Sequence, residues 1–352
     1  MSGATGRAAV VAGVGAWLPP RVVTNDDLAR HLDTSDEWIR SRTGITRRHL
    51  VDPGTATAIL ATEAGVMAFK SAGCGDVDSV IVATTTPERL CPATAPQVAA
   101  RLGLAGIAAH DVSAVCTGFL YGLATAAGQI ATGVAERVLL IGAEAFSTII
   151  NPADRETAVI FGDGAGAVVL RAGAVDEPGA VGPCVLGSDG DLSDLIMVPA
   201  GGSGQRASGL AAHPDDYYFQ MRGRDVYRHA VERTTEAAGA ALERAGWRAE
   251  DVDRLVPHQA NARICAAIAE RLGIPPERQA SNIERVGNTA AASIPLLLTE
   301  DSARGRLVRG DHVLLAAFGG GLTWGAATLT WPELGTVASN MPGLGDQPVG
   351  VG

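Results

Sequence analysis

The sequence has 352 residues, a formal net charge of −10 and hydrophobic side chains at 47% of its positions. This length and composition are typical of a compact protein with a large core, and the negative charge argues against general nucleic-acid binding. Aromatic residues make up only 4% and glycines number 44, so we expect closely packed small aliphatic side chains.

Short β-branched or leucine-rich runs alternate with alanine-rich helical stretches between residues 7 and 332, which predicts an α/β protein. The expected strands are 79–85, 137–143, 165–171, 253–256, 312–317 and 325–330. The expected helices are 56–72, 117–133, 225–245, 260–272 and 290–303. The last twenty residues, 333–352, are rich in glycine and proline, and we expect a flexible tail there.

The two halves of the sequence resemble each other in order. The run at 78–84 resembles 253–258, the turn at Cys116 resembles that at Gly287-Asn288, and 162–170 resembles 323–329. We interpret this echo as an internal duplication, with an N-terminal half at 1–180 and a C-terminal half at 181–332. Residues at equivalent strand ends would then converge where the halves meet.

The stretch from Val112 to Ala135 has no charged residue and is long enough to span a bilayer. It is nonetheless rich in glycine, alanine, threonine and serine, so we interpret it as a helix buried inside the protein and expect no membrane partner. The odd count of five cysteines, without a recognisable signal segment, predicts a cytoplasmic protein. No cysteine and histidine spacing suits a metal, and no metal site is expected.

Cys116 has the surroundings of a nucleophile. Residues 112–115 ahead of it are predicted to be a short buried strand, and Phe119, Leu120 and Leu123 behind it have helical spacing. A thiol at the start of a helix meets free N–H groups and the positive end of the helix dipole, which favour the thiolate and can polarise a carbonyl group. A lone cysteine in an apolar stretch is more often inert, so this interpretation requires partners elsewhere.

Three later segments supply such partners. His258 follows the strand that Pro257 ends, and Asn288 precedes a small-residue helix. The segment Phe318-Gly-Gly-Gly-Leu-Thr-Trp324 follows a buried strand, and its glycines could aim an N–H group at a substrate. Each signal is weak alone, since His258 could be an ordinary polar residue and Asn288 a helix cap.

Taken in order, these segments resemble the β-ketoacyl-acyl-carrier-protein synthase III family. The matching stretches are Thr34–Ile45, Asp111–Leu123, Phe161–Ala167, Val256–Asn261, Gly287–Pro295 and Gly319–Gly325. The resemblance covers residues 23–330 and implies a thiolase-like, duplicated αβαβα five-layered α/β fold and a homodimer. It also implies an acyltransferase that acts in fatty-acid or polyketide biosynthesis.

The resemblance implies a mechanism for each residue. Cys116 takes an acyl group from an acyl-CoA, with the N–H groups of Cys116 and Gly320 as the oxyanion hole. Malonyl-acyl carrier protein then loses CO2, and the side chains of His258 and Asn288 stabilise the enolate that attacks the acyl group. Coenzyme A is a substrate here, and no cofactor is expected.

The resemblance also implies coenzyme A contacts and a departure in the acyl pocket. The implied contacts are Trp38, Arg42, Arg155, Arg228, Asn261 and Arg263. Cys91 stands where some acetyl-selective members have a phenylalanine that crosses the dimer interface and closes the acyl pocket. The smaller side chain predicts tolerance of starters longer than acetyl.

Other functions remain open at this point. A transferase on the same fold could move the Cys116-bound acyl group to a hydroxyl or amine without decarboxylation. A biosynthetic thiolase is disfavoured, since no second cysteine follows Cys265. A dinucleotide-binding loop at 162–166 is disfavoured, since its glycines precede a strand-like run. A non-catalytic scaffold would usually lack the thiol.

Overall fold

The computed structural model of the chain describes residues 6–342 and 347–348, and the strands of these residues form two main sheets. In spatial order, the first sheet contains β15 (Gln347–Pro348), β14 (Thr336–Ser339), β1 (Arg7–Trp17), β7 (Gly164–Ala174), β6 (Arg137–Glu144), β4 (Ser79–Ala83) and β5 (Ala108–Val112). The second contains β11 (Arg254–Pro257), β12 (His312–Gly319), β13 (Thr323–Thr330) and β8 (Val181–Ser188). Short ribbons pair β2 (Arg21–Thr24) with β3 (Arg47–Leu50), and β9 (Ile196–Met197) with β10 (Gln220–Met221).

Helices separate and cover these sheets. The α-helices are α1 (Asn25–Ala29), α2 (Asp36–Thr43), α3 (Thr57–Ala72), α4 (Ala95–Arg101), α5 (Gly118–Ala131), α6 (Ser203–Ser208), α7 (Gly223–Ala245), α8 (Ala262–Leu272), α9 (Ile283–Val286) and α10 (Ser293–Ala303). The 3-10 helices are η1 (Val115–Thr117), η2 (Phe146–Ile149), η3 (Gly190–Leu195), η4 (Pro214–Tyr217), η5 (Ala249–Asp251), η6 (Pro276–Arg278) and η7 (Ala290–Ala292).

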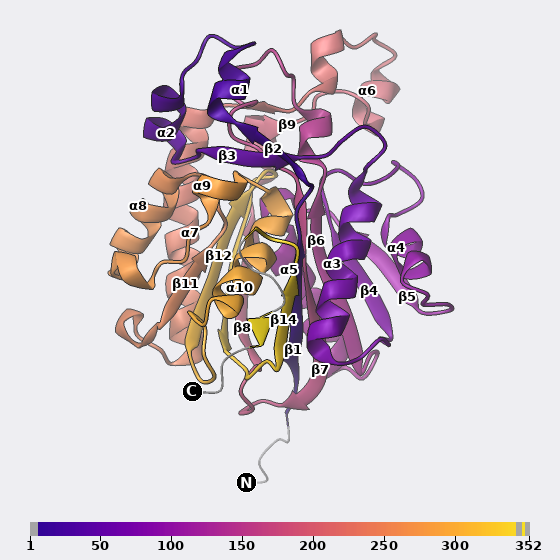
Figure 1. Cartoon of the computed structure of the whole chain (residues 1–352), viewed down its shortest axis with the longest axis vertical. Coiled ribbons are helices and arrows are strands. Elements are labelled where there is room, and N and C mark those ends of the chain that lie inside the picture. The colour runs from indigo at the N-terminus through magenta and orange to yellow at the C-terminus, as the bar shows by residue number, and fades with distance from the viewer. Residues whose placement is uncertain (1–5, 343–346, 349–352) are drawn as a thin grey trace.

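The elements stack in five layers, which are seen from side to side in Figure 1. Helix α3 packs on β1, β7 and β6, and α7 packs on β13, β12 and β8. Helices α5 and α10 lie between the two sheets, where α5 contacts β6 and β13 and α10 contacts β7 and β11. This order is the αβαβα layering that the resemblance to the family implies.

The central strands are apolar on both faces because helices cover both faces. All five residues of β4 are buried, and the strand contacts both α4 and α5. Helix α3 presents a row of alanines to the sheet, among them Ala61, Ala64 and Ala68. Such small side chains let the helix approach the strands closely, as the low aromatic content predicts.

The second sheet repeats the topology of the first. The order β11-β12-β13-β8 matches β4-β6-β7-β1, with the same parallel and antiparallel neighbours. A parallel bridge between Leu255 and Gln279 stands where β5 pairs with β4 in the first sheet. The internal duplication is therefore present in the fold, while the boundaries 1–180 and 181–332 stay a prediction.

Two local predictions are wrong. The strand ahead of Cys116 is not at 112–115 but at Ala108–Val112, and the chain has already turned at Ser113 and Ala114. Strands β1 and β8 were not predicted, because glycines and a proline interrupt their apolar runs.

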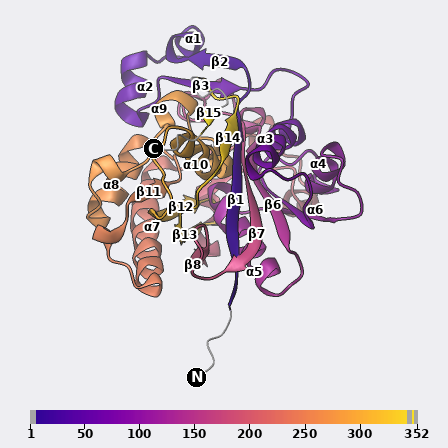
Figure 2. The ribbon, with the colours of Figure 1, turned by 60° about the horizontal axis from the view of Figure 1, so that its bottom comes forward.

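The prediction of a flexible tail at 333–352 is wrong for its first part. Strand β14 pairs in parallel with β1, so that Gly15 faces Ala338, and Figure 2 shows the two strands side by side. Val337 and Met341 are buried in the core, and the Asn340 side chain bonds both the N–H and the carbonyl group of Leu18. Burial and pairing therefore order this segment, and the tail residues 343–346 and 349–352 lie outside the described residues.

None of the helices among the described residues combines the length and the apolar character that a membrane span requires. Helix α5, the centre of the uncharged stretch, instead lies between the two sheets.

Candidate active site

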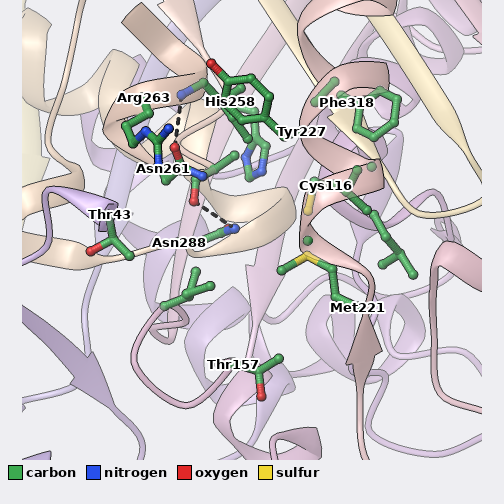
Figure 3. A pocket seen from close by; sticks show the side chains of 18 of the residues that line it. Thr43, Cys116, Thr157, Met221, Tyr227, His258, Asn261, Arg263, Asn288 and Phe318 are labelled. Atoms are coloured by element: carbon green, nitrogen blue, oxygen red, sulfur yellow. Dashed lines mark hydrogen bonds between the residues drawn. The ribbon is translucent and has the colours of Figure 1, made fainter. Parts of the chain in front are cut away.

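A cavity of about 890 Å³ opens between the first sheet, the second sheet and the α1–α2 region. Seven of the residues singled out in the sequence line it: Trp38, Arg42, Cys116, His258, Asn261, Arg263 and Asn288. Figure 3 shows the imidazole of His258 and the amide of Asn288 on the side of the cavity that faces the Cys116 thiol. The fold thus brings together three side chains that are far apart in the sequence.

Cys116 lies in a tight turn between β5 and α5. The residue before it, Val115, has a φ of 47°, a left-handed conformation that is strained for a β-branched side chain. This turn is backed by Gly319 at the end of β12, where a Cβ atom would lie 2.8 Å from the Cys116 nitrogen. The glycine segment therefore lets the second sheet touch the backbone of the thiol residue.

Two effects on the Cys116 thiol favour its protonated form. Burial raises the pKa of Cys116, and the nearby Glu144 carboxylate raises it further. Apolar neighbours explain the burial, since Cys116 packs against the cluster of Phe146, Phe161 and Phe219. Desolvation opposes the stabilisation of the thiolate that is expected at the start of the helix, and that expectation stays a prediction.

His258 follows β11 and is held on two sides. Its backbone N–H donates to the Ala316 carbonyl group at 2.7 Å, which keeps the residue on the line of the strand. Its Nδ1 atom lies 2.7 Å from the Ser293 hydroxyl oxygen at the start of α10. The side chain is buried, and burial lowers its pKa to about 3, so the imidazole is neutral at neutral pH.

Asn288 lies between α9 and η7 with its backbone fixed in both directions. Its N–H donates to the Ile160 carbonyl group and its own carbonyl group accepts from Gly162, both at 2.9 Å. The side-chain oxygen accepts from the Ala290 N–H at 2.9 Å, whereas the side-chain nitrogen reaches the Ala260 carbonyl group only at 3.5 Å. The NH2 group is thus left as a weakly engaged donor at the cavity wall.

An aromatic side chain with two guanidinium groups close to its ring marks the mouth of the cavity. The Arg42 and Arg155 guanidinium carbons lie 4.8 and 4.5 Å from the Trp38 ring centroid. Farther along the wall, Arg263 lies 5.8 Å from the Tyr227 ring centroid. Asn261 caps α8 through its side-chain oxygen, which leaves its NH2 group to donate elsewhere. A flat ring and several cations form a surface suited to a purine and phosphates.

Four of the predicted site residues do not line the cavity of the described chain: Arg155, Arg228, Gly320 and Cys91. Arg155 nevertheless reaches the site through Trp38, and Gly320 directly follows the lining residue Gly319. Arg228 is exposed on α7, and Cys91 is exposed on the segment between β4 and α4. Their predicted contacts with coenzyme A and with a partner's acyl pocket stay predictions.

The apolar wall beside the thiol was missed in the sequence. Ile196, Phe219 and Met221 come from the β9–β10 ribbon region and line the cavity with Phe161. Phe161 stacks on Phe146 at 4.3 Å between ring centroids, and Phe219 meets both rings edge-on at 5.1 Å. Only Phe161, next to the glycine segment, carried a sequence signal. That segment leads into β7 rather than into a helix, unlike a dinucleotide-binding loop.

A second missed residue is Glu144, a fully buried carboxylate at the end of β6. It accepts hydrogen bonds from the Thr85 N–H at 3.0 Å and from the Thr86 hydroxyl at 2.9 Å. Burial raises its pKa to about 7 despite these donors. Glu144 therefore anchors the start of the segment that carries Cys91. Across residues 6–342 and 347–348, no group of three or more His, Cys, Asp or Glu side chains could hold a metal ion.

Comparison with protein families gives two matches. The model described as 3-oxoacyl-acyl-carrier-protein (ACP) synthase III matches residues 110–190. The model described as the C-terminal part of the same enzyme matches residues 242–331. The matched regions contain Cys116 in the first case and His258 and Asn288 in the second.

Named relatives resemble the chain over nearly its whole length. A β-ketoacyl-acyl-carrier-protein synthase III from Streptomyces coelicolor is 61% identical and covers 94% of this chain and 99% of its own. A counterpart from Pseudomonas aeruginosa is 51% identical, covering 93% and 98% respectively.

Solved structures agree with the predicted thiolase-like fold. The crystal structure of 3-oxoacyl-acyl-carrier-protein synthase III from Pseudomonas aeruginosa aligns with a TM-score of 0.87 at 49% identity, covering 93% of this chain and 99% of that one. A priming β-ketosynthase from a polyketide biosynthetic pathway aligns with a TM-score of 0.87 at 32% identity, covering 93% and 97%.

Proposed function

The chain belongs to the 3-oxoacyl-acyl-carrier-protein synthase III family of condensing enzymes, and on that premise we propose how its side chains divide the reaction between them. An acyl-CoA starter acylates Cys116, and decarboxylative condensation with malonyl-acyl carrier protein then gives a 3-ketoacyl carrier protein. The observation that carries this assignment is that Cys116, His258 and Asn288 line the same cavity, below a mouth suited to a nucleotide.

In the first half-reaction the Cys116 sulfur attacks the thioester carbonyl group. The N–H groups of Cys116 and Gly320 receive the developing oxyanion, and the contact of Gly319 with the Cys116 backbone supports this pairing. The neutral thiol loses its proton during the exchange, and that proton leaves on the sulfur of coenzyme A. The products are an acyl-enzyme and free coenzyme A.

In the second half-reaction malonyl-acyl carrier protein loses CO2 and leaves an enolate. Two neutral donors, the His258 imidazole and the Asn288 amide, stabilise its oxygen. The low pKa of His258 and the non-titrating amide support this role, since neither group loses its donor at neutral pH. The carbanion attacks the acyl carbonyl group, and Cys116 leaves as a thiolate that takes up one proton.

The mouth of the cavity binds coenzyme A in this scheme. Trp38 stacks on the adenine with Arg42 and Arg155 beside it, which their positions around the ring support. Asn261 contacts the pantetheine arm, and Arg263 and Arg228 contact the phosphates. The acyl chain extends from Cys116 along Phe161 and Phe219. With Cys91 in place of a bulky aromatic residue, starters longer than acetyl fit.

The open edge of the first sheet supports a homodimer. Strand β5 is partly exposed at this edge, and Leu90 beside Cys91 is 73% exposed. A homodimer that covers these residues would place Cys91 at the partner's acyl pocket. We propose a cytoplasmic location, in which the enzyme would meet a diffusing carrier protein. Light scattering of the purified chain tests the dimer.

The direct test combines mass spectrometry with a CO2 assay. Incubation with an acyl-CoA should add one acyl group to the protein, and peptide mapping should locate it on Cys116. The Cys116→Ala variant should lose the adduct, whereas Cys265→Ala, which removes a buried thiol, should keep it.

Malonyl-acyl carrier protein should then release CO2 and the acyl group together. Acyl transfer to a hydroxyl or amine without CO2 would instead support the alternative transferase. A series from acetyl-CoA through butyryl- to hexanoyl-CoA tests the pocket, and a drop in activity along it would contradict the role given to Cys91.

A further inference from the structure

Ser293 meets the side of the His258 imidazole that faces away from the cavity. It is the first residue of α10, it is 1% exposed, and its hydroxyl oxygen lies 2.7 Å from His258 Nδ1. The same oxygen accepts a hydrogen bond from the Gln259 N–H at 3.3 Å. One hydroxyl therefore contacts both the ring and the backbone of the segment that carries the ring.

The direction of the hydrogen bond to His258 follows from counting protons. The Gln259 N–H can only donate, so it leaves the single hydroxyl proton of Ser293 still in need of an acceptor. Among the described residues, the only acceptor within hydrogen-bond distance of that hydroxyl is His258 Nδ1. The reverse arrangement, with a proton on Nδ1, would leave a buried O–H group without an acceptor, which folded proteins avoid.

We propose that Ser293 is a positioning residue that donates to Nδ1 and thereby fixes neutral His258 as the tautomer with its proton on Nε2. Nδ1 is engaged by Ser293 on the inner side, so Nε2 is the nitrogen left to act in the cavity that His258 lines. The ring is buried and uncharged, so the tautomer decides which nitrogen donates. Gln259 completes the arrangement, because its side-chain oxygen accepts from the N–H groups of Asn282 and Ile283 ahead of Asn288.

The inference rests on the proposed function and makes it more specific. An Nε2–H group can donate to the enolate oxygen of the second half-reaction. The same group cannot accept the Cys116 proton in the first, so that proton must leave on coenzyme A. Loss of Ser293 should therefore impair condensation and leave acylation of Cys116 unchanged.

Nuclear magnetic resonance tests the tautomer without any assay of activity. In protein labelled with ¹⁵N-histidine, the nitrogen shifts distinguish a protonated from an unprotonated ring nitrogen, and the signals missing in His258→Gln identify His258. We expect a proton on Nε2 in the wild type and a mixture of tautomers in Ser293→Ala. A proton on Nδ1 in the wild type would overturn the proposal.

Kinetics of the separate half-reactions provide the second test. Ser293→Ala should lower kcat for condensation about tenfold, with little change in KM for malonyl-acyl carrier protein and an unchanged rate of Cys116 acylation. Ser293→Thr, which keeps the hydroxyl, should recover most of the loss. Ser302→Ala, which removes another buried serine of the same helix, is the matched control and should leave both half-reactions unchanged.

The possible results distinguish a failure of the proposed function from a failure of the role given to Ser293. A wild-type protein that forms no acyl-enzyme or releases no CO2 would contradict the proposed function itself. An active wild type whose Ser293→Ala variant slows both half-reactions equally, or neither, would contradict only the role of Ser293.

Discussion

The same backbone turn occurs twice in this molecule, and only one copy carries a reactive group. Both η1 and η7 begin with a non-glycine residue of positive φ, Val115 at 47° and Ala290 at 43°, and both lead directly into a helix between the sheets. The second residue of the turn is Cys116 in η1 and Ala291 in η7. Duplication has preserved the strained turn in both halves, whereas the thiol is present in only one of them.

The two turns also share a mode of support, because each packs on a strand of the opposite half. A Cβ atom at Gly319 of β12 would lie 2.8 Å from the Cys116 nitrogen, and one at Gly142 of β6 would lie 2.3 Å from the Ala291 oxygen. The halves are therefore interlocked at the site. The proposed roles differ accordingly, with the nucleophile on η1 and the hydrogen-bond donors His258 and Asn288 around η7.

The largest expected effect comes from changing Asn288, the hydrogen-bond donor that precedes η7. Asn288→Asp replaces the amide with an anion that repels the enolate, so condensation should fall by about 10²- to 10³-fold, or about 3 kcal/mol of transition-state stabilisation. Acylation of Cys116 should continue, which a stopped-flow or mass-spectrometric acylation assay of the same variant checks. Equal loss of both half-reactions would show that the two turns do not divide the chemistry.

The glycines behind the turns test their interlocking. Gly142→Ala and Gly319→Ala should each lower the free energy of unfolding by about 1–3 kcal/mol, because the added methyl group has no space. Gly142→Ala should slow condensation more, and Gly319→Ala should slow acylation more. Urea unfolding and the two kinetic assays measure these effects.

Gly239→Ala is the matched control. This position lies inside α7 and a Cβ atom there would meet nothing within 4 Å, so the substitution should stabilise the protein slightly. If Gly142→Ala and Gly319→Ala left the free energy of unfolding unchanged, the close packing of the turns against these strands would not contribute to stability.

Sequence motifs identified the three proposed catalytic side chains better than the residues that contact and position them. Cys116, His258 and Asn288 stand out because short glycine and proline signals mark the turns that carry them. Ser293 looks like any residue at a helix start, and its contact with His258 depends on tertiary packing. The raised pKa of Cys116 was missed for the same reason, since a helix start is local but desolvation comes from Phe146, Phe161 and Phe219.

The fold was predictable where periodicity was strong and not elsewhere. The uninterrupted apolar run of β4 identifies a covered strand, whereas Gly13 and Gly15 interrupt β1. Strand β14 has no sequence signal of its own, because its four residues become a strand only by pairing with β1.

A further expected effect is a pair of opposite pH dependences from two buried groups at strand ends. Burial lowers the pKa of His258 from 6.5 to about 3, so its contribution to stability is complete above pH 6.5 and is lost as the pH falls towards 3. Burial raises the pKa of Glu144 from 4.5 to about 7, so its contribution is complete below pH 4.5 and is lost as the pH rises through 7.

Urea titrations between pH 3 and pH 8 should separate the two groups. Each contributes a slope of about 1 kcal/mol per pH unit within its window, and the opposite slopes cancel in the wild type between pH 4.5 and 6.5. In that range Glu144→Gln should reveal the rise with pH that comes from His258, and His258→Gln should reveal the decline that comes from Glu144. Identical pH profiles for wild type and variants would contradict the assigned shifts.

Strand β14 has a consequence for how the chain folds. In the pairing of β1 with β14, Ala338 lies opposite Gly15, so the two strands come from segments that are far apart in the sequence. During synthesis the first strand must therefore wait for its outer neighbour until residues 336–339 have been made, so this step in assembling the first sheet comes after more than 300 intervening residues have been translated.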